Sequence, residues 1–269
     1  MAELDYFKGI ISDKSANTQK SYITQYKKLY KLLDKNIGDT SQKTLMDTIK
    51  EIDNANSRQA LLNIGILIRT DKKLDIKDLL KYRETLSQNI KTAQKENNVV
   101  LQESLPSYNE LVEYTESLKG KNDLYYILNY LLINYNVRNE DLHFKIITRK
   151  KEAKDTNFNY IWLSPRKVEY IRNVYKTAGN YGQKLYIIPD KPFASAVRRL
   201  VKENWESPTM EQMPYIIKKA TLLGIGEAKY NKIIVNHFRN DIDKLKQISE
   251  RRGTSITTLL QSYDIESKD

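Results

Sequence analysis

Apolar residues recur at helical spacing through most of the sequence, and one region interrupts this pattern. In the first hundred residues the apolar side chains repeat every three or four positions, as Tyr22, Tyr26, Leu29 and Leu33 do. Ser15 or Asn17 can cap the helix that contains them. The pattern predicts a bundle of four or five helices, which would include about 15–33, 41–52, 56–69 and 76–96.

The interruption lies between Arg138 and Phe193. Four short segments there are rich in β-branched and aromatic residues, and turn formers separate them. We expect these segments to be strands, at 144–149, 160–163, 168–173 and 184–188. Helical spacing precedes them at 107–118 and 122–135, and it returns from Phe193 to a last helix that begins near Ser255. The predicted fold class is mainly α with a small antiparallel β-sheet.

A domain boundary is expected between Glu96 and Pro106. Apolar periodicity is weak in this segment, which ends in proline. Ser107 then begins a capping box with Glu110, the pattern that starts a helix. We therefore expect a helical domain over 1–98 and a second domain, with helices and the sheet, over 104–269.

The composition excludes several classes of site. Cysteine is absent and there are two histidines, which excludes disulfides, thiolate metal sites, a cysteine nucleophile and a multi-histidine metal site. The glycine patterns of nucleotide-binding loops are also missing. The apolar stretches are too short to span a bilayer. The first ten residues lack the basic and apolar regions of a secretory signal. We expect a protein that is neither membrane-bound nor secreted.

The charge balance points to a polyanionic partner. Lys and Arg number 45 against 34 Asp and Glu, a net charge of +11, and residues 151–200 alone contain ten basic and four acidic side chains. A basic surface attracts nucleic acid. Solubility alone is the other explanation of this charge. An anionic membrane surface is disfavoured, because no basic amphipathic helix with bulky apolar residues is visible.

Four segments contain residues suited to phosphate chemistry. Arg138 follows an apolar helix, in Asn-Val-Arg-Asn-Glu-Asp-Leu, and precedes a strand. Lys176 lies at the tip of a predicted hairpin, and Lys184 begins the strand after it. The third segment is Asn-His-Phe-Arg over 236–239, and the fourth runs from Arg-Gly-Thr at 252–254 to Tyr263. Taken singly, each has an ordinary explanation as a capping turn, a hairpin or an amphipathic helix.

In this order the segments resemble the motifs of the tyrosine recombinase, or phage integrase, family. The resemblance implies that Arg138 and Arg239 hold a phosphate and that Tyr263 is the nucleophile. It implies Lys176 as the general acid, with Lys184 as the alternative. The sequence departs from the family in two places. Where the family usually has histidine, this chain has Asn236, with His237 one position later. Where the family usually has histidine or tryptophan, this chain has Thr254. All three would be auxiliary.

The resemblance also implies a function. A member of this family cleaves and rejoins double-stranded DNA through a phosphotyrosyl bond to the 3′ phosphate, without a metal or other cofactor. It does so where the DNA is, in the cytoplasm or nucleus, and a homotetramer on DNA is one arrangement that the family uses. Residues 15–22 resemble the start of the family's helical core-binding domain. We expect the DNA to contact Lys20, Arg149, Lys150, Lys151, Arg172 and Lys184.

Two other functions fit the same residues. A type IB topoisomerase shares the fold and the tyrosine chemistry but relaxes supercoils as a monomer. A DNA-binding protein that has the fold without the activity would explain the replaced histidine positions. Richness in Lys, Asn, Ile and Tyr is typical of an AT-rich genome, such as that of a virus or mobile element.

Overall fold

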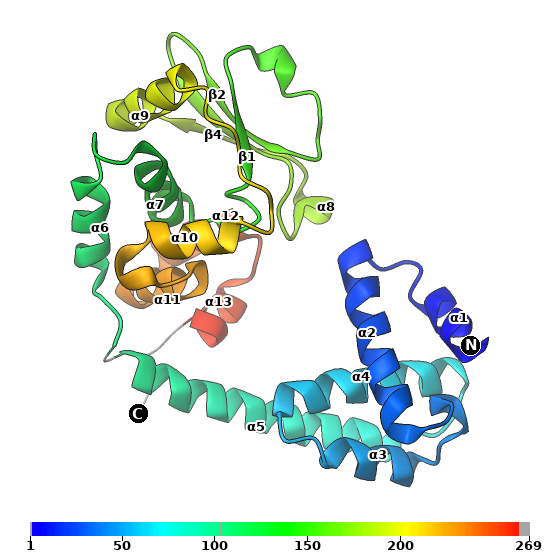
Figure 1. Cartoon of the computed structure of the whole chain (residues 1–269). Coiled ribbons are helices and arrows are strands. Elements are labelled where there is room, and N and C mark those ends of the chain that lie inside the picture. Colours follow the sequence, from blue (N-terminus) through cyan, green and yellow to red (C-terminus); the bar gives the residue numbers. More distant parts are fainter. Residues whose placement is uncertain (1, 103, 264–269) are drawn as a thin grey trace. The chain divides into compact units, whose positions relative to one another are not determined.

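The computed structural model describes residues 2–102 and 104–263 (Figure 1). The chain divides into two compact units, Met1–Asn97 and Asn98–Asp269, called unit 1 and unit 2 below. Among the described residues, the regular elements of unit 1 are all helices, whereas unit 2 contains helices and one four-stranded sheet. The fold class is thus mainly α with a small sheet.

Unit 1 is built from helices whose starts are fixed by polar caps. The side chains of Ser15, Ser41 and Asn54 each accept a hydrogen bond from a backbone N–H in the first turn of the following helix. Its helices are α1 (Ala2–Ile10), α2 (Ala16–Leu33), the 3₁₀ turn η1 (Ile37–Asp39), α3 (Gln42–Lys50), α4 (Ala55–Asp71) and α5 (Lys77–Gln102).

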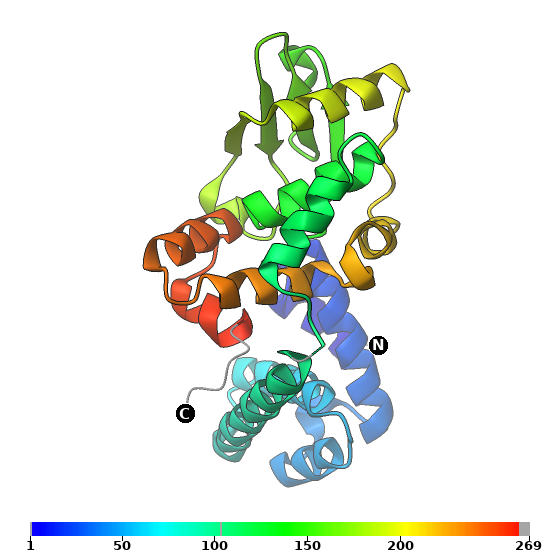
Figure 2. The ribbon, with the colours of Figure 1, turned by 90° about the vertical axis from the view of Figure 1, so that its left-hand side faces the viewer.

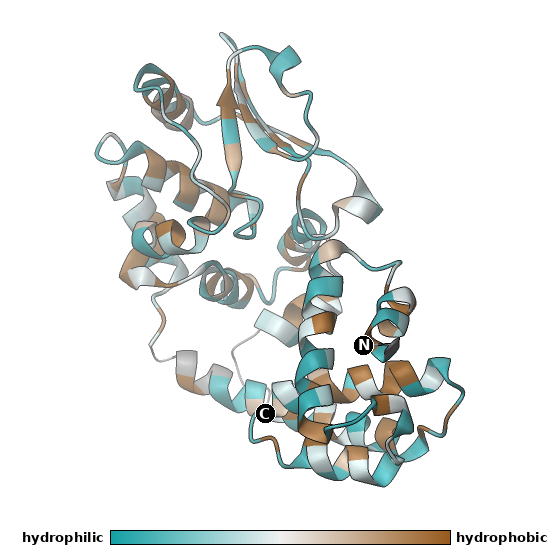
Figure 3. Ribbon diagram, turned by 45° about the vertical axis from the view of Figure 1, so that its right-hand side comes forward, coloured by the Kyte–Doolittle hydropathy of each residue, from teal (hydrophilic) through white to brown (hydrophobic). Residues whose placement is uncertain are grey.

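The unit 1 helices differ from the predicted ones at both ends of the domain. The sequence pattern predicted no helix at α1. This helix buries Phe7 in the core of the unit. The last helix, α5, continues about six residues past Glu96, because no glycine or proline interrupts the chain before Pro106. The hydrophobic sides of these helices face inward and their outer sides are hydrophilic (Figure 3).

Unit 2 has most of its elements where the sequence pattern places them. Its helices are α6 (Tyr108–Ser117), α7 (Asp123–Tyr135), α8 (Ala178–Tyr181), α9 (Lys191–Lys202), α10 (Met213–Ala220), α11 (Glu227–His237), α12 (Ile242–Arg252) and α13 (Ile256–Tyr263). Its strands are β1 (Phe144–Ile147), β2 (Asn159–Leu163), β3 (Val168–Arg172) and β4 (Lys184–Ile188). Two short 3₁₀ turns complete it, η2 (Lys150–Glu152) and η3 (Leu222–Gly224).

The sheet is mixed, so the expectation of an antiparallel sheet is wrong for one of its pairs. The strand order is β1-β2-β3-β4, and the β2–β3 and β3–β4 pairs are antiparallel. β1 runs parallel to β2, with Phe144 opposite Asn159. The connection over 148–158, which includes η2, is long enough to return the chain to the end at which β1 began.

The core of unit 2 lies between the sheet and helices α7 and α9. α7 is apolar on nearly all sides and contributes Ile127, Leu128 and Leu131, all fully buried. α9 crosses the strands and buries Phe193 and Val197 in the same cluster (Figure 2). The remaining helices, α10 to α13, bring the end of the described chain back to the turn that follows α7.

Over residues 2–102 and 104–263, no helix has both the length and the apolar character that a membrane span requires.

Candidate active site

The turn after α7 fixes the position of Arg138. Asn136 ends the helix in the left-handed conformation, with φ of 50°. The backbone N–H of Arg138 donates to Asp141 Oδ2 at 2.7 Å, which closes a tight turn. The Arg138 side chain is half-buried, and its Nη1 donates to the backbone carbonyl of Arg252 at 2.7 Å. This turn therefore directs a guanidinium toward the end of α12.

Arg252 supplies a second guanidinium at the same place. It is the last residue of α12 and is 1% exposed. Its Nη1 donates to the backbone carbonyl of Asn136 at 3.1 Å, so each arginine of the pair binds backbone next to the other. Its Nη2 lies 2.6 Å from the Tyr263 hydroxyl and 2.9 Å from Glu227 Oε1. Two cations, a phenol and a carboxylate thus meet in one cluster.

The residues of this cluster shift the pKa of Arg138. Burial lowers the pKa of Arg138 below its ordinary value, and the positive charge of Arg252 lowers that pKa further. Asp141, Tyr263 and Glu227 act in the opposite direction. Since both guanidiniums are desolvated and repel each other, an anion placed between them would be stabilised.

A buried ion pair supports the turn from behind. Arg172, at the end of β3, lies 2.5 Å from Asp141 Oδ2, and neither side chain is exposed. Arg172 Nη1 donates to the backbone carbonyl of Arg251 at 2.9 Å, and its guanidinium lies over the Tyr175 ring. Arg172 therefore ties the Arg138 turn to α12, and its side chain has no exposed surface with which to contact DNA.

Lys184 lies beside these groups. Its Nζ donates to the backbone carbonyl of Glu250 at 2.5 Å and lies 4.9 Å from the Tyr175 ring centre. Burial lowers the pKa of Lys184 below that of an ordinary lysine, and Arg172 and Arg138 lower it further. Lys184 is thus an electrostatic neighbour of Arg138.

Lys176 lies at the edge of the same region, and its side chain is exposed. Burial raises the pKa of Glu140, two residues after Arg138, and the nearby Lys176 acts in the opposite direction. The next residue, Thr177, packs against Gly253, which ends α12 with φ of +61°. A Cβ at Gly253 would overlap the Thr177 hydroxyl, so glycine is required for this close approach.

The segment 236–239 has other contacts in this structure. The His237 ring is exposed and stacks on Tyr108, with ring centres 4.2 Å apart. Asn236 Oδ1 is buried and has no hydrogen-bond partner in the part of the chain that the structure describes. The backbone N–H of Arg239 donates to the Asn236 carbonyl at 3.3 Å.

Thr254 closes the turn between α12 and α13. Its backbone N–H donates to the carbonyl of Ser249, and its own carbonyl accepts from Ser249 Oγ at 2.7 Å. The Thr254 side chain is half-buried. This turn reverses the chain directly after Arg252 and allows α13 to return Tyr263 to that arginine.

The other expected DNA contacts are spread over both units. Lys20 is exposed on α2 of unit 1, and Lys151 is exposed on η2 of unit 2. Arg149 pairs with Glu152, and Lys150 pairs with Glu169 at 3.0 Å.

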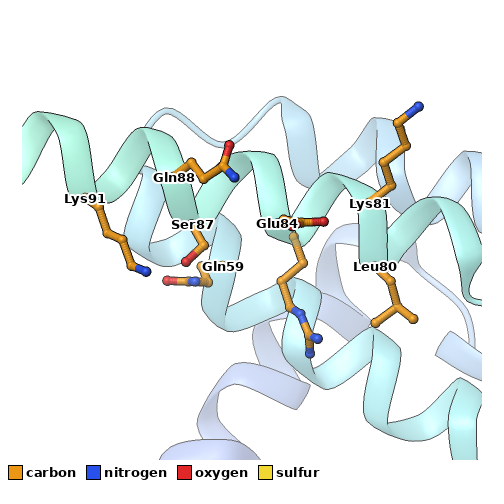
Figure 4. Close-up of a pocket in the computed structure, with 8 residues that line it drawn as sticks. Gln59, Leu80, Lys81, Glu84, Ser87, Gln88 and Lys91 are labelled. Atoms are coloured by element: carbon orange, nitrogen blue, oxygen red, sulfur yellow. The ribbon is translucent and has the colours of Figure 1, made fainter. Parts of the chain in front are cut away.

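Unit 1 has a polar cavity of about 620 Å³ along α5. Gln59 of α4 lines it with residues of α5 that include Lys81, Ser87 and Lys91 (Figure 4). Arg83 adds a third cation, and Glu84 is the one carboxylate among the lining residues. This surface is suited to a sugar–phosphate backbone.

The sequence pattern assigned no role in the site to two residues of the cluster, Arg252 and Glu227. Arg252 lies in the fourth motif, but motif spacing favours Arg239 as the second guanidinium. Glu227 begins α11 and has no signal in the sequence that distinguishes it from other acidic residues at helix starts. No group of three or more acidic or histidine side chains suited to a metal ion occurs among the described residues.

Comparisons with known proteins give a distant likeness, and it lies among solved structures. No protein-family model matches the chain, and no curated protein matches it. Among solved structures, the chain is similar to one titled "Crystal structure of XerA recombinase", with 11% sequence identity and a TM-score of 0.39. The match covers 98% of this chain and 92% of that one.

Proposed function

We propose that the protein cleaves and rejoins double-stranded DNA through a covalent bond to Tyr263, in the manner of a tyrosine recombinase. The observation that supports this most directly is the Tyr263 hydroxyl, which accepts a hydrogen bond from Arg252 at 2.6 Å. Arg138 is held within the same cluster. A candidate nucleophile therefore lies beside two desolvated cations that can bind a phosphate.

The chemistry follows from these groups. In the proposed site, Arg138 and Arg252 bind the non-bridging oxygens of a phosphodiester, whose negative charge grows during attack. The phenol of Tyr263 gives its proton to solvent water, and its oxygen forms a bond to phosphorus while the bond to the 5′ oxygen breaks. Lys184 donates a proton to that leaving oxygen. The reverse steps restore the phosphodiester and free the tyrosine.

A nicked suicide duplex tests this proposal. Such a substrate loses the short strand after cleavage, so a covalent intermediate accumulates. Wild-type protein is expected to give a protein–DNA band that survives denaturation, and Tyr263→Phe to give none. Since phenylalanine keeps the ring beside Arg252, DNA binding by this variant, measured by gel shift, serves as the control. An adduct of equal yield in the two proteins, or none in either, would refute Tyr263 as the nucleophile.

The general acid can be tested separately. Lys184→Ala is expected to lower the cleavage rate of ordinary DNA by about 10²-fold. Most of this loss should disappear on DNA with sulfur in place of the bridging 5′ oxygen, because a thiolate leaves without protonation. In wild type, the rate should fall as the pH rises through the lowered pKa of Lys184. Lys176→Ala is the matched control, and sulfur rescue of that variant instead would assign the role to Lys176.

One contact favours a second candidate function, that of a DNA-binding protein without the activity. Glu227 pairs with Arg252 and so occupies a donor that the phosphate would need. If this carboxylate stays in place, DNA binds through surface cations such as those along α5, with an affinity that falls steeply with salt. Salt-dependent binding without any adduct would favour this function. Relaxation of plasmid lacking a specific site would instead indicate topoisomerase activity.

A further inference from the structure

A cavity in unit 2 is lined by residues close to the arginine pair in the chain, among them Asn136 and Arg251. It has a volume of about 260 Å³ and is formed by α6, α7, α11 and α12. This is smaller than the roughly 300–1,000 Å³ of pockets that hold drug-sized ligands. The cavity is therefore suited to a compact, ring-sized group.

The walls of this cavity are aromatic and cationic. Tyr108, Tyr130 and Phe238 line it with half-buried rings. Lys244 and Arg251 also line it, and no carboxylate is among its lining residues within the described part of the chain. Aromatic surfaces stack on the π-faces of nucleobases, and cations beside them attract the attached phosphate.

One lining residue has unused hydrogen-bonding capacity. Asn136 is 1% exposed, and neither its amide nitrogen nor its amide oxygen has a partner in the part of the chain that the structure describes. An amide without partners at this depth is costly, and its donor and acceptor together match the edge of a purine, above all adenine. The exposed amide of Gln247 lines the same cavity.

Two residues that line the cavity accept hydrogen bonds, through their backbone carbonyls, from arginines at the candidate active site. The carbonyl of Asn136 accepts from Arg252, and that of Arg251 accepts from Arg172. A nucleotide whose phosphate lies at the arginine pair would have neighbouring bases near this cavity. An unpaired base is required, because a base within a duplex has both faces stacked and its pairing edge occupied.

We propose that this cavity binds an unpaired purine base, which packs against the aromatic wall of Tyr108, Tyr130 and Phe238 and makes an edge contact to Asn136. The base can come from DNA or from a free nucleotide. The affinity gained by one stacked base is about tenfold or more. The proposal does not depend on covalent chemistry, so it is tested in the Tyr263→Phe protein, where no adduct can form through that residue.

The test compares three duplexes that differ at one position. One is fully paired, one has a single bulged adenine, and one has an abasic residue in place of that adenine. The bulged duplex should bind about tenfold more tightly than both others. Equal binding of the bulged and abasic duplexes would overturn the proposal, because flexibility of the strand would then explain any preference.

A variant links this preference to the cavity. Asn136→Gly removes the amide while keeping a residue that tolerates the positive φ at this position, and it should reduce the preference for the bulged adenine. The Gln247 side chain is exposed, so Gln247→Ala should leave the fold intact and serves as a second variant. Full preference in both variants would overturn the assignment to this cavity. Competition by free AMP, but not by ribose 5-phosphate, would identify a nucleotide source in addition to DNA.

Discussion

Replacing Arg252 with alanine is expected to lower the rate of adduct formation on the suicide duplex by about 10²- to 10³-fold. Arg252 combines a contact to the Tyr263 hydroxyl with a guanidinium placed against that of Arg138. In the transition state its donors would bind oxygens that gain negative charge, and alanine removes them all. The measurement is the single-turnover rate at saturating protein, which separates the chemical step from binding.

Two companion variants decide how this loss is explained. Arg252→Lys keeps the charge but not the planar pair of donors, and it should recover only part of the rate. Arg239→Ala tests the assignment that motif spacing favours. A loss in Arg239→Ala as large as that in Arg252→Ala would contradict the pairing of Arg138 with Arg252. Thermal unfolding of each variant is needed as a control, because Arg252 is buried and also binds Glu227.

The position of Arg252 beside Arg138 shows what a sequence pattern leaves undetermined. The pattern places the helices well, and Arg239 and Arg252 are separated by one helix, α12. The return of Arg252 to the Arg138 turn depends on the angles between α11, α12 and α13. Those angles arise from tertiary contacts, such as the close approach of Gly253 and Thr177, which no local periodicity encodes.

The sheet illustrates the same limit. Its four strands begin and end within about two residues of their predicted positions, because β-branched runs and turn formers are local signals. The direction in which strands pair is not local, and the parallel β1–β2 pair differs from the expected arrangement. Burial is also set by tertiary packing. The sequence predicts Arg172 as a DNA contact, yet its side chain is fully buried against Asp141.

Asp141→Ala is expected to lower the free energy of unfolding by about 3–5 kcal/mol, the range found when one partner of a buried ion pair is removed. The Asp141 carboxylate holds Arg172 at 2.5 Å and the backbone N–H of Arg138 at 2.7 Å. Without it, the Arg172 guanidinium stays buried with an uncompensated charge. The measurement is equilibrium unfolding by denaturant, followed by two probes because the chain has two units.

Two comparisons show whether the buried pair is the cause of this loss. Glu152→Gln breaks the largely exposed pair with Arg149 and should change the free energy of unfolding by about 0.5 kcal/mol or less. The double variant Asp141→Ala/Arg172→Met removes both charges, so its loss should be smaller than the sum of the two single losses. Strictly additive losses would mean that Asp141 stabilises the fold through the Arg138 turn alone. In that case the turn, and not the ion pair, would hold the arginine of the candidate site in place.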